Sequence, residues 1–169
     1  MVEVRKAELS DESALAALDR ATWDWQSSPA PAPGEGRMFF DEKTVPDDVL
    51  VARIDGELAG YVRIGPATPL EASRHVLMVT GIAVDPELRR QGAGRALIEA
   101  AAAEAHRRGA KRLTLRVLGP NESARRLYES AGFAIEGVLR GEFFLDGRYV
   151  DDVLMALELD AHGRPAAVS

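Results

Sequence analysis

The sequence predicts a mixed α/β or α+β domain with helices on both faces of one sheet. Strand-like runs alternate with stretches of helical spacing, in the order β α loop β β β α β α β β. The dipeptides Asp55-Gly56 and Asp146-Gly147 each separate two strand-like runs, which indicates antiparallel hairpins. With 169 residues, the chain is expected to form a single domain over residues 1–160, followed by a frayed tail at 161–169.

Composition narrows the function. The chain is 46% hydrophobic and 28% charged, with a net charge of −6, as in ordinary globular proteins. The absence of cysteine excludes disulfides, thiolate metal ligands and a cysteine nucleophile. The acidic balance argues against a nucleic-acid partner, which needs an excess of Lys and Arg. Because no segment has the roughly 20 apolar residues of a membrane span and the first residues are charged, we expect a cytoplasmic protein with no membrane partner.

The first third of the chain predicts a strand, a helix and a long loop. Val2–Glu8 alternates apolar and charged residues, as an edge strand does, and Ser10 suits the N-cap of the helix that follows. Three prolines exclude helix and central strand from Ser27–Gly36. The aromatic residues beside this loop either anchor it to the core or line a substrate pocket: Trp23, Trp25, Phe39 and Phe40.

The middle of the chain predicts a hairpin, a central strand and a helix. Val49–Gly65 is the hairpin, and the apolar run Arg74–Val84 is typical of a strand covered on both faces. Gly81 within that run indicates a bulge or a close approach of another chain segment. The helix carries an apolar stripe from Leu97 to Ala105 and ends at Gly109.

The last third predicts a strand, a short helix and a second hairpin. The strand is Lys111–Leu118, and the helix runs over Asn121–Gly132 with Asn121 as its N-cap. Phe133–Leu145 and Arg148–Leu159 form the hairpin.

The segment "LRRQGAGRALIEA" (Leu88–Ala100) has the composition of an anion site. Arg89, Arg90 and Arg95 supply charge, while glycines at 92 and 94 let the backbone approach a bulky anion. The first N–H groups of the helix add unpaired donors. The segment fits neither common nucleotide motif, since residue 97 is leucine and no Gly-Lys-Ser/Thr follows. A plain helix start is the alternative.

A second motif, "NESARRLYESAGF" (Asn121–Phe133), follows one strand later. In this order, the stretch Val84–Leu97 and this motif resemble the GNAT superfamily of acyl-CoA-dependent N-acyltransferases. The resemblance implies a mostly antiparallel, splayed sheet of about seven strands flanked by about four helices. It implies acetyl-CoA as co-substrate and no metal. The stretch from Glu136 to Leu157 resembles members that act on free amino acids or on protein N-terminal amines.

The resemblance also implies roles for individual residues. The strand backbone that pairs with the pantetheine arm maps to Ile82, Ala83 and Val84. The turn that holds the pyrophosphate maps to Arg89, Arg90, Gln91, Gly92, Ala93, Gly94 and Arg95. Asn121 and Tyr128 map beside the thioester sulfur, with Tyr128 as general acid. The spacing is consistent, because seven residues are about two helical turns, and a Tyr hydroxyl can donate to a leaving thiolate.

The general base stays open. Some relatives carry a Glu five residues before the asparagine, where this chain has Arg116, and others carry one in the central strand, where this chain has none. The remaining candidates, acting directly or through water, are His75, Glu142, Asp151 and Asp152. Asp151 shares strand parity with apolar residues, so it is either an inward-facing base or a structural carboxylate bonded to backbone.

Three functions follow as hypotheses. The first is an acetyl-CoA-dependent N-acetyltransferase that moves an acetyl group to a primary amine of a small molecule or amino acid. The second is a protein N-terminal or lysine acetyltransferase, and the third is a non-catalytic acyl-CoA-binding sensor. Edge strands near the C-terminal hairpin are compatible with a homodimer.

Overall fold

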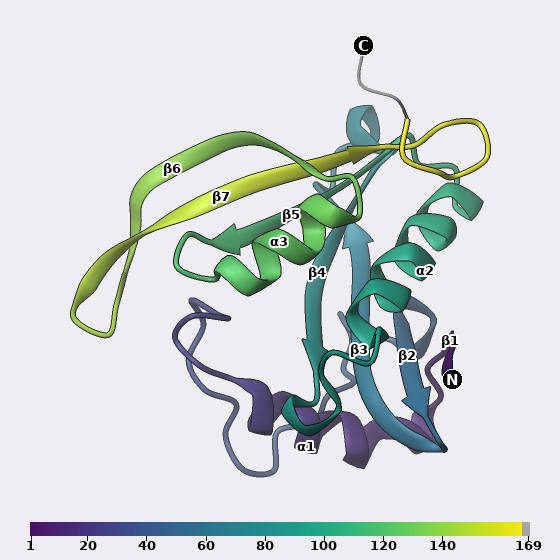
Figure 1. Cartoon of the computed structure of the whole chain (residues 1–169), viewed down its shortest axis with the longest axis vertical. Coiled ribbons are helices and arrows are strands. Elements are labelled where there is room, and N and C mark those ends of the chain that lie inside the picture. The colour runs from purple at the N-terminus through teal and green to yellow at the C-terminus, as the bar shows by residue number, and fades with distance from the viewer. Residues whose placement is uncertain (167–169) are drawn as a thin grey trace. The chain divides into compact units, whose positions relative to one another are not determined.

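The computed structural model describes residues 1–166 and contains a seven-stranded sheet in the order β1-β2-β3-β4-β5-β7-β6 (Figure 1). Its strands are β1 (Val2–Lys6), β2 (Val49–Ile54), β3 (Glu57–Pro66), β4 (Val76–Val84), β5 (Arg112–Leu118), β6 (Ala134–Leu145) and β7 (Arg148–Glu158). β4 and β5 are parallel, whereas β1–β2, β2–β3, β5–β7 and β6–β7 are antiparallel. The predicted mixed fold class is confirmed.

The described residues contain three α-helices, against about four expected: α1 (Glu12–Thr22), α2 (Ala93–Arg107) and α3 (Glu122–Ser130). No α-helix forms between α1 and β2, where the structure has only a 3₁₀ turn at Pro46–Asp48. The three prolines of the Ser27–Gly36 segment prevent a helix there. The predicted loop is therefore confirmed.

The chain divides into two compact units. The first unit comprises Met1–Trp23, Ala32–Ile64 and Thr80–Ala101, and the second comprises Asp24–Pro31, Gly65–Val79 and the chain from Ala102 onward. β4 and α2 each contribute residues to both units. The single domain expected over residues 1–160 stays a prediction.

The aromatic residues after the long loop belong to the core of the first unit. Phe39 packs edge-on against both Phe40 and Tyr61, with ring centroids 5.2 and 4.9 Å apart. The Glu12 carboxylate accepts the backbone N–H groups of Phe39 and Phe40 at 2.6 and 2.9 Å, which joins the loop end to α1. Both phenylalanines therefore anchor the loop to the core, which was the first of the two predicted alternatives. Trp25 is exposed.

The start of α1 differs from the prediction. The chain first makes a 3₁₀ turn at Leu9–Asp11, so Ser10 is inside that turn instead of capping α1. Asp11 holds the turn by accepting the Glu8 N–H at 2.8 Å, and it forms a bidentate pair with Arg5 at 2.8 and 2.9 Å. The pair lowers the pKa of Asp11. The serine prediction failed because a stronger, charged acceptor lies one residue later.

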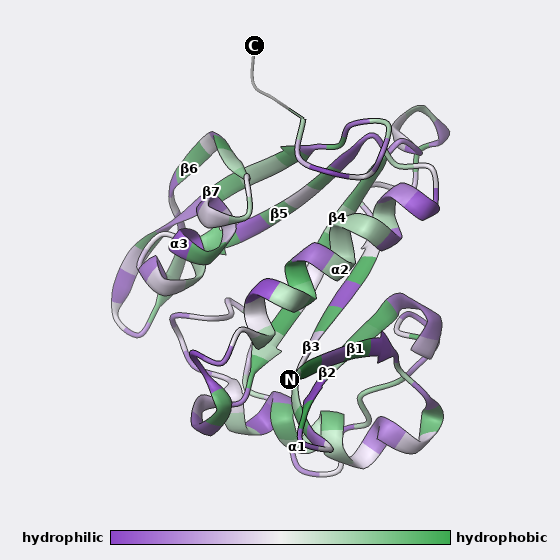
Figure 2. Ribbon diagram, turned by 45° about the vertical axis from the view of Figure 1, so that its right-hand side comes forward, coloured by the Kyte–Doolittle hydropathy of each residue, from purple (hydrophilic) through white to green (hydrophobic). Residues whose placement is uncertain are grey.

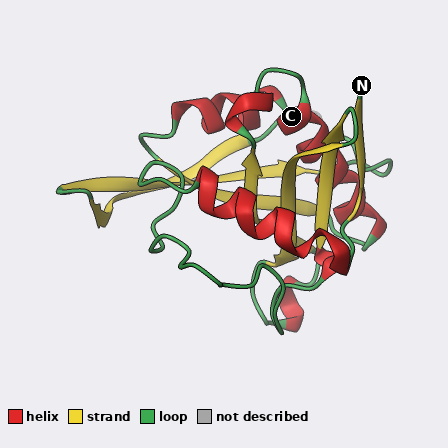
Figure 3. Cartoon of the chain, turned by 90° about the horizontal axis from the view of Figure 1, so that it is seen from below, coloured by secondary structure: helices red, strands yellow, loops and turns green. Residues whose placement is uncertain are grey.

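The second unit is built on β7, which pairs with β5 on one side and β6 on the other. Asp146 and Gly147, at φ of 49° and 77°, form the predicted hairpin turn of the long β6–β7 ribbon (Figure 3, strands in yellow). β6 has register shifts between Ile135 and Gly137 and between Leu139 and Phe143. Of the expected tail, residues 161–166 form a turn closed by a Leu159–Pro165 bridge, and residues 167–169 lie outside the described residues.

Hydrophobic and hydrophilic residues alternate along α2 (Figure 2). Its fully buried positions, among them Leu97 and Ala101, repeat at helical spacing and confirm the predicted apolar stripe. Within residues 1–166, no helix has both the length and the apolar character needed to cross a membrane.

Candidate active site

The end of β4 has an unusual environment for an apolar inner strand. β4 is in register with β5 only from Val76 to Met78, although β4 continues to Val84. The strand was expected to be covered on both faces, yet its last residues, Ile82, Ala83 and Val84, are only half-buried. Their peptide groups are consequently candidates for hydrogen bonds with an extended ligand.

Gly81 makes room for an arginine that the sequence reasoning missed. A Cβ at residue 81 would lie 3.1 Å from a terminal nitrogen of Arg63. That guanidinium donates to the carbonyl and hydroxyl oxygens of Thr80 at 3.2 Å each, and to the Thr44 hydroxyl at 3.3 Å. Gly81 correctly indicated the close approach of another chain segment. The alternating pattern of β3 did not indicate that this segment would be the side chain of Arg63.

Between β4 and α2 the chain reverses through two left-handed residues. Arg90 has φ of 64° and Gly92 has φ of 91°. Gly92 is therefore required by the backbone, while Gly94 lies in the first turn of α2. The helical ladder includes an Ala96 N–H bond to the Gly92 carbonyl at 3.0 Å, and the N–H groups ahead of it face out of the helix end.

The charges around this turn suit a diphosphate. Arg89 and Arg90 are exposed, and neither forms an ion pair or hydrogen bond within residues 1–166. Arg95 is partly neutralised by Glu99, whose carboxylate lies 2.6 Å from its Nε. Free guanidinium groups beside unpaired helical N–H donors are what a phosphate-binding turn requires. The residues of the turn therefore fit the pyrophosphate of acetyl-CoA.

In the second unit, α3 presents Asn121 and Tyr128. Asn121 is the N-cap, and its side-chain oxygen accepts the Ala124 N–H at 3.2 Å. This confirms the capping role and leaves the two amide hydrogens of its side chain available.

Tyr128 is 5% exposed, and its ring packs against Phe133 with centroids 5.9 Å apart. Burial raises its pKa to about 12. Its hydroxyl has no hydrogen-bond partner in the described chain and is not among the fully buried unpaired atoms, so it is open to an incoming acceptor.

The candidate bases lie in different surroundings. Asp151 is half-buried, and one of its carboxylate oxygens accepts the Gly141 N–H at 2.9 Å. This bond to backbone agrees with the alternative of a structural carboxylate. Asp152 is only 2% exposed and is paired with Arg116, whose Nε lies 2.6 Å from a carboxylate oxygen. The carboxylate of Asp152 is therefore neutralised by Arg116.

The structure brings some predicted residues together within each unit and separates others. Asp151 accepts the Gly119 N–H through its carbonyl at 2.9 Å, which places it beside the entry to α3. His75 is exposed, and its carbonyl accepts N–H groups at the opposite end of β5, which is about 20 Å long. Glu142 is exposed on β6. Of the two candidate bases near the entry to α3, Asp152 is paired with Arg116, which leaves Asp151 as the one with no ion pair within residues 1–166.

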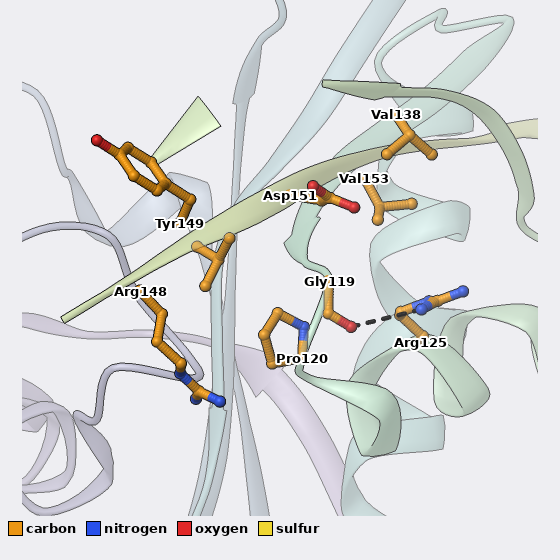
Figure 4. A pocket seen from close by; sticks show the side chains of 9 residues that line it. Gly119, Pro120, Arg125, Val138, Arg148, Tyr149, Asp151 and Val153 are labelled. Atoms are coloured by element: carbon orange, nitrogen blue, oxygen red, sulfur yellow. Dashed lines mark hydrogen bonds between the residues drawn. The ribbon is translucent and has the colours of Figure 1, made fainter. Parts of the chain in front are cut away.

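A cavity of about 440 Å³ opens beside Asp151, at the junction of β5, α3 and the β6–β7 ribbon (Figure 4). Its lining is Gly119, Pro120, Arg125, Val138, Arg148, Tyr149, Val150, Asp151 and Val153. All of these residues belong to the second unit. The cavity has the size of a small-molecule site.

Residues 14–133 match the model of the acetyltransferase (GNAT) family. The chain belongs to the GNAT acetyltransferase family. It is 45% identical over 80 residues to the ribosomal protein bS18-alanine N-acetyltransferase of Escherichia coli K12, a match that covers 46% of the chain and 53% of that relative. The match to this GNAT relative thus spans about half its length. Another relative is the L-methionine sulfoximine/L-methionine sulfone acetyltransferase of Salmonella typhimurium, 29% identical over 70% of the chain and 69% of that protein.

Solved GNAT-like structures agree with the fold. Protein smu.2055 from Streptococcus mutans has a TM-score of 0.84 at 30% identity, over 94% of this chain and 99% of that one. Protein yncA from Salmonella typhimurium, solved with its cofactor acetyl-CoA, has a TM-score of 0.74 at 22% identity, over 99% of both chains.

Proposed function

We propose that the protein transfers an acetyl group from acetyl-CoA directly to a primary amine of a small molecule or amino acid. The observation that carries this proposal is Tyr128, a buried tyrosine whose hydroxyl has no partner among the described residues. Membership in the GNAT family and the diphosphate-compatible turn support the choice of co-substrate.

The turn from Arg89 to Arg95 and the N-terminus of α2 bind the pyrophosphate in this proposal. The free guanidinium groups of Arg89 and Arg90 neutralise part of its charge, and helical N–H groups donate to its oxygens. Backbone groups of Ile82, Ala83 and Val84 pair with the pantetheine arm. Asn121 offers side-chain N–H donors near the thioester.

In the chemical step, the lone pair of the neutral amine attacks the thioester carbon, and the carbonyl electrons move onto oxygen. Backbone N–H groups at the end of β4 stabilise this oxyanion. When the tetrahedral intermediate collapses, the carbon–sulfur bond breaks and its electron pair leaves on sulfur. The amine proton passes to Asp151, directly or through water.

Tyr128 acts on the leaving sulfur. With a pKa of about 12, its hydroxyl remains protonated across the neutral range. Because a thiol has a pKa of about 8.5, the tyrosine holds its proton more tightly than the thiolate does. It therefore lowers the barrier chiefly by donating a hydrogen bond to sulfur as negative charge develops there.

The test is release of CoA from acetyl-CoA in the presence of separate pools of amino acids, polyamines and peptides. Release that depends on an amine pool, with an acetylated product seen by mass spectrometry, is the expected result. Binding of acetyl-CoA without turnover on any pool would favour the acyl-CoA sensor, and failure to bind acetyl-CoA would overturn the proposal.

A second function is acetylation of a protein N-terminus. It is supported by the 45% identity with the ribosomal-protein-alanine enzyme, within the 80 matched residues. Turnover on peptides with a free N-terminal alanine, at rates above those for free alanine, would select this function.

We also propose that the protein forms a homodimer through β6. β6 is the last strand in the sheet order and exposes the apolar side chains of Ile135 and Leu139, which lie outside the cavity lining. A dimeric mass in light scattering that becomes monomeric in Ile135→Lys is the expected result.

A further inference from the structure

The geometry points to a specificity for acceptors that carry a carboxylate close to the reactive amine. We propose that the cavity of the second unit is the acceptor pocket, and that Arg125 and Arg148 bind the carboxylate of a free amino acid within it. The inference rests on the proposed acetyl transfer and goes further by naming the group that selects the acceptor.

The two arginines of the cavity are not neutralised by the protein. Arg148 is exposed and forms no ion pair or hydrogen bond within residues 1–166. Arg125 is half-buried, and within residues 1–166 its side chain makes a single, long hydrogen bond of 3.4 Å, to the Gly119 carbonyl. Its Nε is fully buried with no acceptor. The guanidinium thus retains unsatisfied donors, and its charge has no carboxylate partner.

Two other arginines of the same unit, by contrast, are paired with carboxylates. Arg112 is paired with Glu136 at 2.8 Å, and Arg116 is paired with Asp152. The cavity holds two guanidinium groups against the single carboxylate of Asp151. Its excess positive charge favours an anionic ligand and disfavours a polyamine.

The position of Arg125 on α3 ties the cavity to the proposed chemistry. Arg125 comes four residues after Asn121 and three before Tyr128, so the three side chains share one side of the helix. An acceptor held at Arg125 is therefore next to the residues proposed to act at the thioester.

The opposing charges suit a zwitterion. In the view of Figure 4, Arg125 and Arg148 lie on either side of Pro120, with Asp151 above it. A guanidinium binds a planar carboxylate through two parallel hydrogen bonds, and the free oxygen of Asp151 can accept from the ammonium group before it loses its proton. Apolar walls remain for a short side chain: Val138, Val150 and Val153.

The experiment compares three pools that share their side chains: free amino acids, the matching amino acid amides, and the matching decarboxylated amines. Dipeptides with an acidic second residue form a fourth pool, because they offer a carboxylate from a side chain. We expect kcat/KM for the amino acid pool to exceed that for the amide and amine pools by at least tenfold.

Substitution of the two arginines tests whether they cause the preference for free amino acids. Arg148→Gln and Arg125→Gln should each lower kcat/KM for the amino acid pool at least tenfold more than kcat/KM for the amine pool, with unchanged KM for acetyl-CoA. Arg126→Gln is the matched control, because Arg126 neighbours Arg125 on α3 but is exposed and lies within 3.5 Å of Glu122. Arg148 is exposed, so its substitution tests the inference even where Arg125→Gln unfolds.

Calorimetric titration of amino acids without acetyl-CoA separates this inference from the proposed function. Binding that is lost in Arg148→Gln supports the pocket even if no acetyl transfer is found. Equal turnover of amino acids and amides by the wild type, or full activity of both variants on amino acids, would overturn the inference. A preference for the acidic dipeptides would overturn the assignment to free amino acids.

Discussion

A Cβ on Gly60 would lie 2.6 Å from the carbonyl oxygen of Ala83. That separation is shorter than real Cβ contacts, and the second neighbour, a Leu97 methyl group, is only 3.1 Å away. The backbone at the end of β4 is therefore packed against a residue that has no side chain. The proposed pantetheine-binding backbone depends on glycine at this position.

Gly60→Ala is expected to destabilise the protein by about 2 kcal/mol, because a backbone oxygen must move to admit the methyl group. Urea denaturation measures the loss. Gly34→Ala is the control, because a Cβ there meets nothing within 4 Å; its effect should be within about 0.5 kcal/mol. Equal midpoints for the two variants would show that β4 adjusts freely.

Tyr128→Phe is expected to lower kcat about 100-fold, because the developing thiolate loses its donor. The Kd for acetyl-CoA, measured by calorimetry, should stay within about twofold of the wild-type value, because the hydroxyl interacts chiefly in the transition state. The ring and its contact with Phe133 are retained in this variant. A wild-type kcat would remove Tyr128 from the reaction.

The pKa of Tyr128 also predicts a dependence of stability on pH. The folded protein holds this proton to a pKa of about 12, whereas an unfolded tyrosine releases it near pH 10. The contribution to stability is therefore complete below pH 10 and is lost as the pH rises through 12. Relative to Tyr128→Phe, the wild type should lose unfolding free energy over this interval. Tyr61, also with a raised pKa, is present in both proteins and cancels in the difference.

The double variant Arg89→Gln/Arg90→Gln should weaken acetyl-CoA binding about tenfold at low salt, because two unpaired charges at the turn are lost. The difference should shrink in 0.5 M salt (roughly a threefold effect), where screening is strong. Arg74→Gln is the control, because Arg74 is exposed and paired with Glu71 at 2.6 Å. An unchanged Kd in the double variant would place the pyrophosphate elsewhere.

Arg116→Ala is expected to cost about 3 kcal/mol of stability, because it leaves the buried carboxylate of Asp152 without its partner. The double variant Arg116→Leu/Asp152→Leu removes both charges and should recover most of that loss. Thermal and urea unfolding measure both. Additive losses in the double variant would show that the two residues are not energetically coupled.

Local signals in the sequence were sufficient to predict the order of helices and strands. Both Asp-Gly turns have left-handed backbones at the predicted residues, and Asn121 caps α3 as expected. These features depend on short-range chemistry that a few neighbouring residues determine. The cytoplasmic location, by contrast, has no structural correlate and stays a prediction.

Long-range pairing could not be predicted in the same way. Nothing adjacent to Gly81 identifies Arg63 as its neighbour, and nothing adjacent to Arg116 identifies Asp152, 36 residues away in sequence. The cavity, too, combines residues from the β5–α3 connection, α3, β6 and β7. Strand register determines these contacts, and it depends on the whole sheet.

The half-buried end of β4 affects how the protein tolerates change. In the proposed binding mode the pantetheine arm is recognised through peptide groups, so exchange of Ile82, Ala83 or Val84 for other apolar residues should leave those hydrogen bonds intact. Alanine substitutions along such a site would leave ligand affinity nearly unchanged. Replacing single amides by esters, which removes one N–H donor and leaves the side chain intact, would reveal it.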